Sequence, residues 1–460
     1  SFYNNIGIVF YEKSEYDLAL QYCLESLEIH KELLGEKHAD VANSYNNIGM
    51  VYNAKSEYDL ALQYYFKSLE IRKELLGERH TNVADSYINI GSVYNDKNEY
   101  DLALQYYFKS LEIYTELLGE KHTVVALSYN NIGVVYNDKK EYDLALQYYY
   151  KSLEINKELL GEKHTDVARS YNNIGMVYNN NKEYDLALQY YSESLEIRKE
   201  LLGEKHTDVA RSYNNIGMVY NNKNDYGLAL QYYQKGVASS LRNFNDTLNI
   251  YSVPLINDFL NWHELLEALQ IKSEIFVSLS ALTEPNCDFD SLQQKSPSGK
   301  INNDRVDYLK YALRHYQACD TLINQSRQSI ITKSDKIALG EQASEVYKGA
   351  VNVCINLAAS SSPRQMGTGS DSVSYYNEHA FYFSEKNKSS VLLEALAGAE
   401  AKKFAGIPDT LLKKEHKLQI DIALYKRILA EQPDSAQEIL FRDKLFNANR
   451  PVSYTHLTLP

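Results

Sequence analysis

The 460-residue sequence lacks the features that mark several large classes of protein. Acidic side chains outnumber basic ones, with 61 Asp and Glu against 48 Lys and Arg, and the formal net charge is −13 at pH 7. A protein that binds nucleic acid needs a basic face to displace counterions from the phosphates. No apolar run approaches the roughly 18 residues of a membrane-spanning helix. We therefore expect neither nucleic acid nor a membrane as a partner.

Cysteine is also scarce, and its residues form neither a Cys-x-x-Cys pair nor a disulfide framework. The four are Cys23, Cys287, Cys319 and Cys354. Scattered thiols of this kind are typical of a reducing compartment. We expect reduced, packed cysteines and a cytoplasmic protein.

Motifs of catalysis and cofactor binding are missing as well. The sequence has no P-loop, no dinucleotide-binding glycine motif, no nucleophile elbow and no zinc-protease motif. His379 and His416 stand in amphipathic helical patterns without a cysteine in a matching motif, and Cys319 and Cys354 fall on apolar stripes. We predict that this stretch of chain is not an enzyme and holds no cofactor and no metal.

Tyrosine is abundant, with 41 residues, and it recurs at fixed positions of a 42-residue unit that runs from Tyr3 to Tyr233. A period of 20–50 residues is the signature of a solenoid, in which each repeat contacts only its neighbours. Six units begin their first helical pattern at Tyr3, Tyr45, Tyr87, Tyr129, Tyr171 and Tyr213. We predict an all-α fold, a right-handed superhelical solenoid of helix-turn-helix repeats followed by irregular helical hairpins.

Each unit predicts two helices joined by a short polar turn. In the second unit, Tyr45, Ile48, Gly49 and Tyr52 have the i, i+3, i+4, i+7 spacing of one helix face. The second helix is expected over 58–76. Glycine inside a helix costs about 1 kcal/mol relative to alanine, so its return at this place in every unit predicts that another helix passes very close.

The ends of these helices also carry signals. Gly77 suits a left-handed C-cap. Threonine after the linker is a plausible N-cap for the next unit, at Thr81, Thr123, Thr165 and Thr207. Asp166 and Asp208 would then lie favourably against a helix N-terminus.

A second stripe on the first helix of each unit is rich in asparagine. Asn46, Met50 and Asn53 lie beside the core stripe, and stacked repeats place equivalent residues in rows along the inner, concave surface. An asparagine side chain both donates and accepts hydrogen bonds, so a row of them can pair with the backbone of an extended peptide. The alternative is that they are solvated or cap neighbouring turns. The predicted partner-binding residues are Asn46, Asn53, Asn95, Asn130, Asn137, Asn172, Met176, Asn179, Asn214, Met218 and Asn221.

Two other rows are predicted to be structural. One has no exception among the six units and should bond between adjacent helices: Asn5, Asn47, Asn89, Asn131, Asn173 and Asn215. The other is the row of linker histidines, His38, His80, His122, His164 and His206. Equivalent residues of neighbouring repeats lie about 8–10 Å apart or more, whereas metal ligands lie about 2.1 Å from a shared ion. The histidines are therefore not expected to bind metal.

The pattern Ile-Gly-x-x-Tyr, followed by Ala, Tyr and Ser in the second helix, resembles the tetratricopeptide repeat. The 42-residue length, the Tyr-Asn-Asn-Ile-Gly start and the Leu-Gly-Glu-Lys-His linker are similar to its kinesin-light-chain type. That type usually carries proline after the linker histidine, where this sequence has threonine or alanine. The resemblance covers 1–235 and implies that asparagines at the matching positions face a peptide groove.

The rest of the sequence has helical patterns without a fixed period, within which helices are expected over 306–331, 334–359, 379–396 and 408–432 and a loop over 360–374. The runs at 380–396 and 401–429 resemble the segment that precedes the caspase-like CHAT domain of bacterial tetratricopeptide-repeat proteins. The final residues resemble a translated sequencing adapter, and we expect them to be non-native. The expected divisions are a repeat array at 1–240, a helical capping segment at 241–282, a flexible loop at 283–304, a degenerate repeat-like region at 305–450 and the tail at 452–460.

Two functions follow from these patterns. The first is a protein–protein interaction scaffold that binds an extended peptide or partner on its concave face, and that recruits or senses for a CHAT protease domain further along the gene. The alternative is a cargo or assembly adaptor like the kinesin light chain, with no enzymatic domain.

Overall fold

The computed structural model of the chain describes residues 2–12, 15–282, 305–329, 333–360 and 369–397, and their regular structure is entirely helical apart from one isolated bridge between Leu241 and Phe259. The chain divides into two compact units, 1–390 and 391–460. The described part of the second unit, 391–397, is the end of one helix. The predicted all-α solenoid of helix-turn-helix repeats is confirmed.

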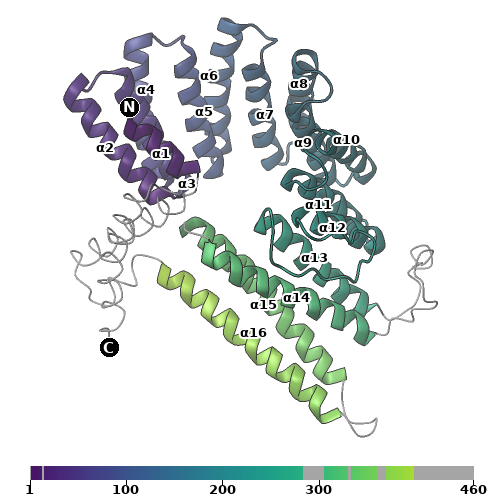
Figure 1. Cartoon of the computed structure of the whole chain (residues 1–460). Helices are drawn as coiled ribbons and strands as arrows, with labels where there is room; N and C mark the ends of the chain where they lie inside the picture. Colours follow the sequence, from purple (N-terminus) through teal and green to yellow (C-terminus); the bar gives the residue numbers. More distant parts are fainter. Residues whose placement is uncertain (1, 13–14, 283–304, 330–332, 361–368, 398–460) are drawn as a thin grey trace, which may run out of the picture. The chain divides into compact units, whose positions relative to one another are not determined.

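Six helical pairs follow one another in chain order (Figure 1). We call the first helix of each pair the A helix and the second the B helix. The pairs are α1 (Phe2–Glu12) with α2 (Tyr16–Leu34), α3 (Ala39–Ala54) with α4 (Tyr58–Leu76), α5 (Thr81–Asp96) with α6 (Tyr100–Leu118), α7 (Thr123–Asp138) with α8 (Tyr142–Leu160), α9 (Thr165–Asn180) with α10 (Tyr184–Leu202), and α11 (Thr207–Asn222) with α12 (Tyr226–Ser240).

The glycine of each A helix lies where the B helix of its own pair approaches most closely. A Cβ added at Gly49 would lie 2.9 Å from the ring of Tyr65, and one at Gly133 would lie 2.8 Å from the ring of Tyr149. Both distances are far shorter than an ordinary van der Waals contact. The predicted packing reason is therefore confirmed, and the group that passes close is the ring of a buried B-helix tyrosine in five pairs and Cys23 in the first pair.

The A helices begin differently from the prediction. The N-cap is the linker histidine, and the threonine after it is the first helical residue. His122 has extended backbone angles, and its Nδ1 accepts a hydrogen bond from the backbone N–H of Val124 at 3.3 Å. The imidazole Nδ1 can satisfy one of the unpaired N–H groups at the helix start, as the hydroxyl of Thr123 was expected to do. The linker histidines thus have the structural role that was predicted for them.

Five of the six B helices end on glycine, as expected, and α12 instead ends before Leu241. Gly77 has a φ of 81° and a ψ of 167°, and its N–H donates to the carbonyl of Lys73 at 2.9 Å. The positive φ favours glycine, but the ψ is extended, whereas a left-handed helical cap would have a ψ near 47°. The chain therefore leaves the helix directly into the extended linker.

Ion pairs join neighbouring pairs of helices along the edge formed by the A-to-B turns. Lys97 Nζ lies 2.9 Å from Asp59 Oδ1, and Lys139 Nζ lies 2.9 Å from Asp101 Oδ1. In the fifth pair Asn181 stands in the place of this lysine. The edge therefore has one junction, at Asp143, without the repeated ion pair.

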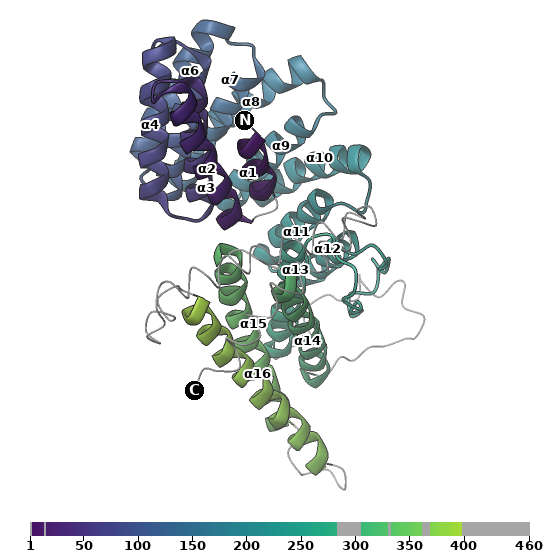
Figure 2. The same cartoon turned by 60° about the vertical axis from the view of Figure 1, so that its left-hand side comes forward.

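After α12 the chain forms a loop, 241–261, before α13 (Trp262–Ala281), which packs against α11 and α12 (Figure 2). Lys205 occupies the position where Lys163 pairs with Glu200 in the preceding repeat, but here its Nζ donates to the carbonyls of Ala238 and Leu241 at 2.8 and 3.0 Å. Lys205, whose equivalent forms an ion pair in the preceding repeat, thus stabilises the end of the array through hydrogen bonds to backbone carbonyls.

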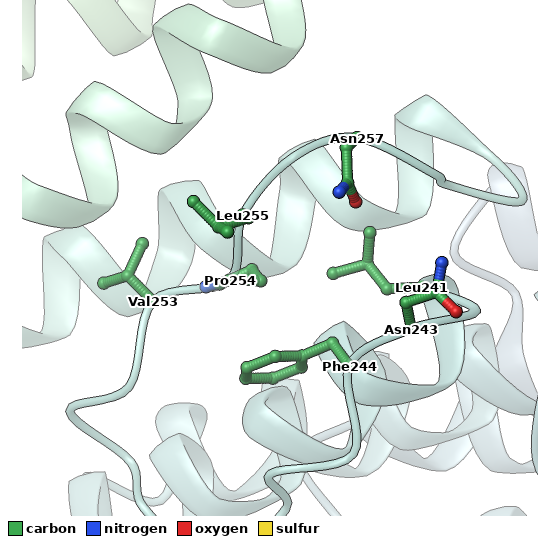
Figure 3. A pocket seen from close by; sticks show the side chains of 7 residues that line it. All are labelled: Leu241, Asn243, Phe244, Val253, Pro254, Leu255 and Asn257. Carbon is green, nitrogen blue, oxygen red and sulfur yellow. The ribbon is translucent and has the colours of Figure 1, made fainter.

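The loop also lines an open pocket of about 280 Å³. Figure 3 shows the ring of Phe244 and the side chains of Leu241 and Pro254 around it. Leu255, on the same loop, is exposed.

Three further helices follow α13 and form with it what we call the cap: α14 (Arg305–Ser329), α15 (Lys333–Ser360) and α16 (Gly369–Ala397). The first two match the helices predicted at 306–331 and 334–359. The loop predicted over 360–374 is wrong at its end, because α16 already begins at Gly369 and continues through His379. The patterns predicted at 283–304, 408–432 and 452–460 lie outside the described residues, as do Cys287 and His416.

Candidate partner-binding face

Three of the predicted binding asparagines are held by the row beside them. Asn89 Nδ2 donates to Asn46 Oδ1 at 2.9 Å, which joins α5 to α3. The same bond recurs from Asn173 to Asn130 at 2.8 Å and from Asn215 to Asn172 at 2.9 Å. The structural role expected for Asn89, Asn173 and Asn215 is confirmed.

This ladder of bonds uses only part of each amide. An asparagine amide has an accepting oxygen and two donor hydrogens. The ladder occupies the oxygen of Asn46, Asn130 and Asn172, and their NH₂ groups can still donate to a ligand. The ladder is interrupted where Ile88 stands in place of the asparagine.

The second row of predicted residues is more deeply engaged between repeats. Asn53 Nδ2 donates to Asp96 at 3.2 Å and Asn95 Nδ2 to Asp138 at 3.5 Å. Asn137 and Asn179 accept from the next A helix through Asn180 and Asn222, each at 3.1 Å, and both are only 7% exposed. This row therefore serves mainly to bond successive A helices, and Asn221 is its half-buried last member.

Asn214 and the two predicted methionines are also covered. Asn214 is 2% exposed, and its Nδ2 donates to the carbonyl of Glu264 on α13 at 3.0 Å. Met176 and Met218 are half-buried and pack against apolar clusters of the array and the cap. Asn214 is therefore not part of the exposed A-helix surface, because α13 covers it.

The A helices differ from one another along a single stripe, and this variation is a signal in the sequence that the shared pattern hides. Each of the five complete A helices has 16 residues. Their sequences differ only at the positions of Ala39, Asp40, Asn43, Asn46, Met50 and Ala54 in α3. With 3.6 residues per turn these positions fall within an arc of about 120°. We call this arc the variable stripe.

The variable stripe lies opposite the tyrosines that pack on the B helix, although Asn43 within it still bonds Arg72 of α4. Tyr45 and Tyr52 lie on the opposite side of α3, where both rings contact the ring of Tyr64 on α4, at 5.9 and 5.4 Å between centroids. Solvent exposure alone does not account for the variation. The glutamines and glutamates equivalent to Gln63 and Glu70 are exposed in all five complete B helices and never change.

One position of the stripe changes most in chemistry and is exposed in every repeat. We call it the Asn43 row: Asn43, Asp85, Leu127, Arg169 and Arg211. Asn43 Oδ1 accepts from Arg72 Nη2 at 3.1 Å, and Asp85 accepts from the hydroxyl of Tyr114. Leu127 is 40% exposed. Along this row the surface therefore changes from acidic to aliphatic to basic.

The basic members of the row have acidic neighbours. Arg169 pairs with Asp166 on its own helix. Arg211 pairs with Asp208 at 3.2 Å and with Glu264 of the cap at 2.6 Å. Of these two arginines, Arg211 is the one that forms an ion pair with α13.

Within the described part of the chain, no three His, Cys, Asp or Glu side chains gather as the ligands of a metal ion would. No helix in these ranges is long and apolar enough to cross a membrane. Cys23, Cys319 and Cys354 are buried free thiols, and burial raises the pKa of the Cys23 thiol to about 11.

Comparison with known families decides what the array is. A tetratricopeptide-repeat model matches residues 1–74, 40–116, 82–158, 123–180 and 166–242, which together span 242 of the 460 residues. The chain belongs to the tetratricopeptide repeat family. Repeats of this family generally bind proteins or peptides. A search of curated proteins finds no match to the chain.

Solved structures of similar fold include three repeat proteins. BtubC (BKLC) from P. vanneervenii is 21% identical over 52% of this chain and 96% of its own, with a TM-score of 0.43. A putative kinesin light chain from Podosopora anserina with nearly identical TPR-like repeats is 14% identical over 44% and 95%, with a TM-score of 0.39. The apo form of RapI is 16% identical over 76% and 98%, with a TM-score of 0.42.

Proposed function

We propose that this chain is a protein–protein interaction scaffold, and that the variable stripe of its A helices binds an extended peptide or an extended segment of a partner protein. The observation that carries the proposal is where the repeats differ. The five complete A helices differ from one another only along the variable stripe, and all their other positions are identical. The B helices vary as well, for example at the exposed position of Phe66 and at the buried position of Arg72. A surface that recognises a specific ligand needs different side chains along its length, whereas the contacts that stack the repeats need the same side chains in each repeat.

The asparagine ladder supplies the backbone contacts in this proposal. The NH₂ groups of Asn46, Asn130 and Asn172 are donors that an extended peptide can meet with its carbonyl oxygens. Asn53, Asn95, Asn137 and Asn179 keep the A helices in register beside it. Met176, Met218 and Asn221 line the edge of the same face, and they contribute packing more than specificity.

We further propose that the array at 1–240 recruits or senses a partner for a CHAT domain encoded beyond this chain. The segment at 241–282 would close the array, and 305–450 would connect it to that domain. The support is the resemblance of the runs at 380–396 and 401–429 to the segment that precedes such domains. No catalytic role is proposed for the chain itself.

The second candidate is a cargo or assembly adaptor without an enzymatic domain. It is favoured by the 42-residue repeat length and the linker sequence, which resemble the kinesin-light-chain type. Sequencing the gene beyond the codon for Arg450 separates the two. A caspase-like sequence with a histidine and a cysteine supports the CHAT proposal, and a stop codon or a coiled coil supports the adaptor.

The scaffold proposal is tested with variants that remove donors and keep the ladder. Asparagine changed to aspartate at Asn46, Asn130 and Asn172 keeps an oxygen to accept from the neighbouring asparagine, but it has no NH₂ group. The matched control places the same three charges on the exposed B-helix glutamines Gln63, Gln105 and Gln147.

Peptides selected from a random library on the unaltered protein serve as ligands, and fluorescence anisotropy gives the dissociation constants. We expect the asparagine variant to bind about ten-fold more weakly or worse, and the control to bind normally, because each lost hydrogen bond is worth about 0.5–1.5 kcal/mol. Equal binding by both variants would refute the role of the face.

A further inference from the structure

We infer that the variable stripe selects a partner segment in which a basic, an aliphatic and an acidic side chain lie in this order over α5, α7 and α9. This inference rests on the proposed function and specifies the ligand chemistry that the face reads. It follows from the side chains of the Asn43 row, from the residues around them and from the distance between A helices.

The centre of the stripe is aliphatic. Leu127 on α7 is 40% exposed, on a face whose other members in the Asn43 row are polar or charged. Val124 and Val134 on the same helix and Ile88 on α5 are half-buried, and all three pack against the apolar clusters beneath them. An aliphatic ligand side chain placed here would cover Leu127 and remove apolar surface from water.

The α5 side of this centre is acidic. Asp85 is exposed, and one of its carboxylate oxygens accepts from the hydroxyl of Tyr114, whose position the B helix α6 fixes. A carboxylate can accept several hydrogen bonds. The second oxygen therefore remains for a lysine or arginine of a ligand.

The α9 side is basic, and the repeats themselves show what is missing there. In the second repeat, Arg72 Nη2 donates to Asn43 Oδ1 at 3.1 Å. In the fifth repeat, Arg198 stands in the place of Arg72, but Arg169 stands in the place of the accepting Asn43. Two guanidinium groups thus occupy the positions where the second repeat has a donor and an acceptor.

The rest of the Arg198 group is satisfied within the protein. Its Nη1 donates to Ser212 Oγ at 2.8 Å and to the carbonyl of Asp208 at 3.2 Å. Burial lowers the pKa of this guanidinium, the charge of Asp208 opposes that shift, and the charges of Arg211 and Arg169 add to it. A ligand carboxylate over Arg169 would supply the acceptor that Asn43 supplies in the second repeat. It would add to the acidic neighbours already present, which are Asp166 beside Arg169 and Asp208 and Glu264 near Arg198.

The spacing of the ligand residues follows from the packing of the A helices. The asparagine ladder bonds each A helix to the next, and packed helices lie about 8–10 Å apart. An extended chain advances about 3.3 Å per residue. Matching residues of the ligand are therefore about three positions apart, and the pattern fits a chain that runs in either direction.

The probes are fluorescein-labelled synthetic heptapeptides with leucine at the centre and serine elsewhere. The mixed peptide has lysine at one end and glutamate at the other, and two further peptides have lysine at both ends or glutamate at both ends. We expect the unaltered protein to bind the mixed peptide about five-fold more tightly than either of the others at low salt, because two exposed charge pairs contribute up to about 1 kcal/mol in total.

Single charge substitutions should then change which of the three peptides binds most tightly, and this change does not depend on the direction in which the peptide runs. Asp85→Arg makes both sides basic, so the peptide with two glutamates should become the tightest ligand. Arg169→Asp makes both sides acidic and should favour the peptide with two lysines. The matched control, Gln105→Arg on the exposed face of α6, should leave the ranking unchanged.

A variant that keeps the hydrogen bond from the Tyr114 hydroxyl to residue 85 serves as a control for a change in folding. Asp85→Asn still offers an oxygen to that hydroxyl but carries no charge, and it should lose the preference for the mixed peptide over the one with two glutamates. Leu127→Ala should weaken all three peptides by a similar factor of about five.

The two proposals fail in different ways. If library peptides bind the asparagine face but the heptapeptides keep one ranking in every charge variant, the charge pattern is wrong and the scaffold remains. If neither library peptides nor heptapeptides bind, the scaffold proposal itself fails. A concentration-dependent dimer in light scattering that Asp85→Arg abolishes would show that a second copy occupies the stripe, which would also overturn the inference.

Discussion

The array of six helical pairs and the cap formed by α13–α16 are both helical, but polar groups hold them together in different ways. In the array the same contacts recur in several repeats, as when Ser68 Oγ donates to the carbonyl of Ala42 and Ser194 Oγ to that of Ala168, each at 2.7 Å. In the cap each buried polar group has its own partners. Loss of a repeated contact should therefore weaken one junction, and loss of a single contact in the cap should weaken the whole cap.

Asp320 shows how the cap is joined. It is 8% exposed and accepts from Tyr347 on α15 at 2.9 Å and from Tyr382 on α16 at 2.8 Å, so that one carboxylate connects three helices. Lys272 is fully buried on α13, and its Nζ donates to Gln234 on α12. His315 on α14 is buried as well, and its Nδ1 bonds the carbonyl of Tyr311 at 2.8 Å.

The largest effect is expected from breaking the core of the array. Tyr149 is fully buried, and its ring fills the space above Gly133. We expect Tyr149→Ala to lower the free energy of unfolding by about 3–5 kcal/mol, as truncation of a buried aromatic ring does. Because repeats couple mainly to their neighbours, urea unfolding followed by circular dichroism should separate into more than one transition.

The matched control for this variant is Tyr149→Phe. The hydroxyl of Tyr149 is buried without a hydrogen-bond partner among the described residues, so its removal should leave the stability nearly unchanged or raise it. A large loss in Tyr149→Phe would show that the hydroxyl is engaged. A single, merely shifted transition in Tyr149→Ala would contradict the independence of the repeats.

The second effect concerns the cap and depends on pH. Burial lowers the pKa of Lys272 from 10.5 to about 7, so the folded cap favours the neutral amine, and the unfolded chain binds the proton up to the higher value. Stability is therefore lowest below about pH 7 and rises with pH by up to about 1.4 kcal/mol per unit towards 10.5. The usable window ends near pH 10, above which tyrosines of the unfolded chain lose protons.

Urea unfolding at several pH values between about 7 and 9.5 measures this slope. Lys272→Met should flatten it, and the exposed Lys348→Met should not. Comparing slopes removes the constant loss caused by leaving Gln234 without its donor. On the acid side, burial and the charge of Lys272 hold the pKa of His315 well below its usual value, so stability should also fall as the pH drops below about 6.5. An unchanged slope in Lys272→Met would mean that this lysine does not titrate on unfolding.

The same contrast explains which parts of the structure could be predicted from the sequence. The helix predicted over 58–76 coincides with α4, and the close approach at Gly49 was expected, because six copies of one pattern average out local ambiguity. Repetition also misled. It drew attention to the asparagines that most repeats share, which mostly bond the repeats together, and away from the Asn43 row, in which the repeats differ most.

The cap could be predicted only as a set of helices. Lys272 sits in an ordinary helical pattern, and nothing near it in the sequence indicates that Gln234, 38 residues earlier, will accept from it. The start of α16 at Gly369 was missed because a run of serine, glycine and proline favours a loop. Without a second copy of the same unit, such long-range polar contacts leave no local signal.

A smaller effect is expected at the start of an A helix. His122 caps α7 through Nδ1, and the same contact recurs at the other linker histidines. We expect His122→Ala to cost about 1 kcal/mol, as loss of an N-cap usually does, and to speed amide hydrogen exchange in the first turn of α7. His122→Asn places an amide oxygen at a similar reach and should restore protection. Equal exchange in His122→Ala and the unaltered protein would show that the cap contributes nothing.

The smallest effect tests whether the irregular edge of the array matters. Lys139 Nζ lies 2.9 Å from Asp101 Oδ1 and 3.1 Å from Glu141 Oε1, and Asn181→Lys should rebuild this arrangement with Asp143 and Glu183. The aspartates of the existing pairs are largely exposed, so the gain should be small, and smaller than the loss expected for the N-cap. Lys139→Asn should lose a similar amount, and Asn181→Gln should change little. Both charge effects should shrink in urea unfolding at high salt, because salt screens exposed pairs. A gain that persists at high salt would mean that the missing lysine loosens this junction through packing, and that the edge contacts carry more of the array's stability than their exposure implies.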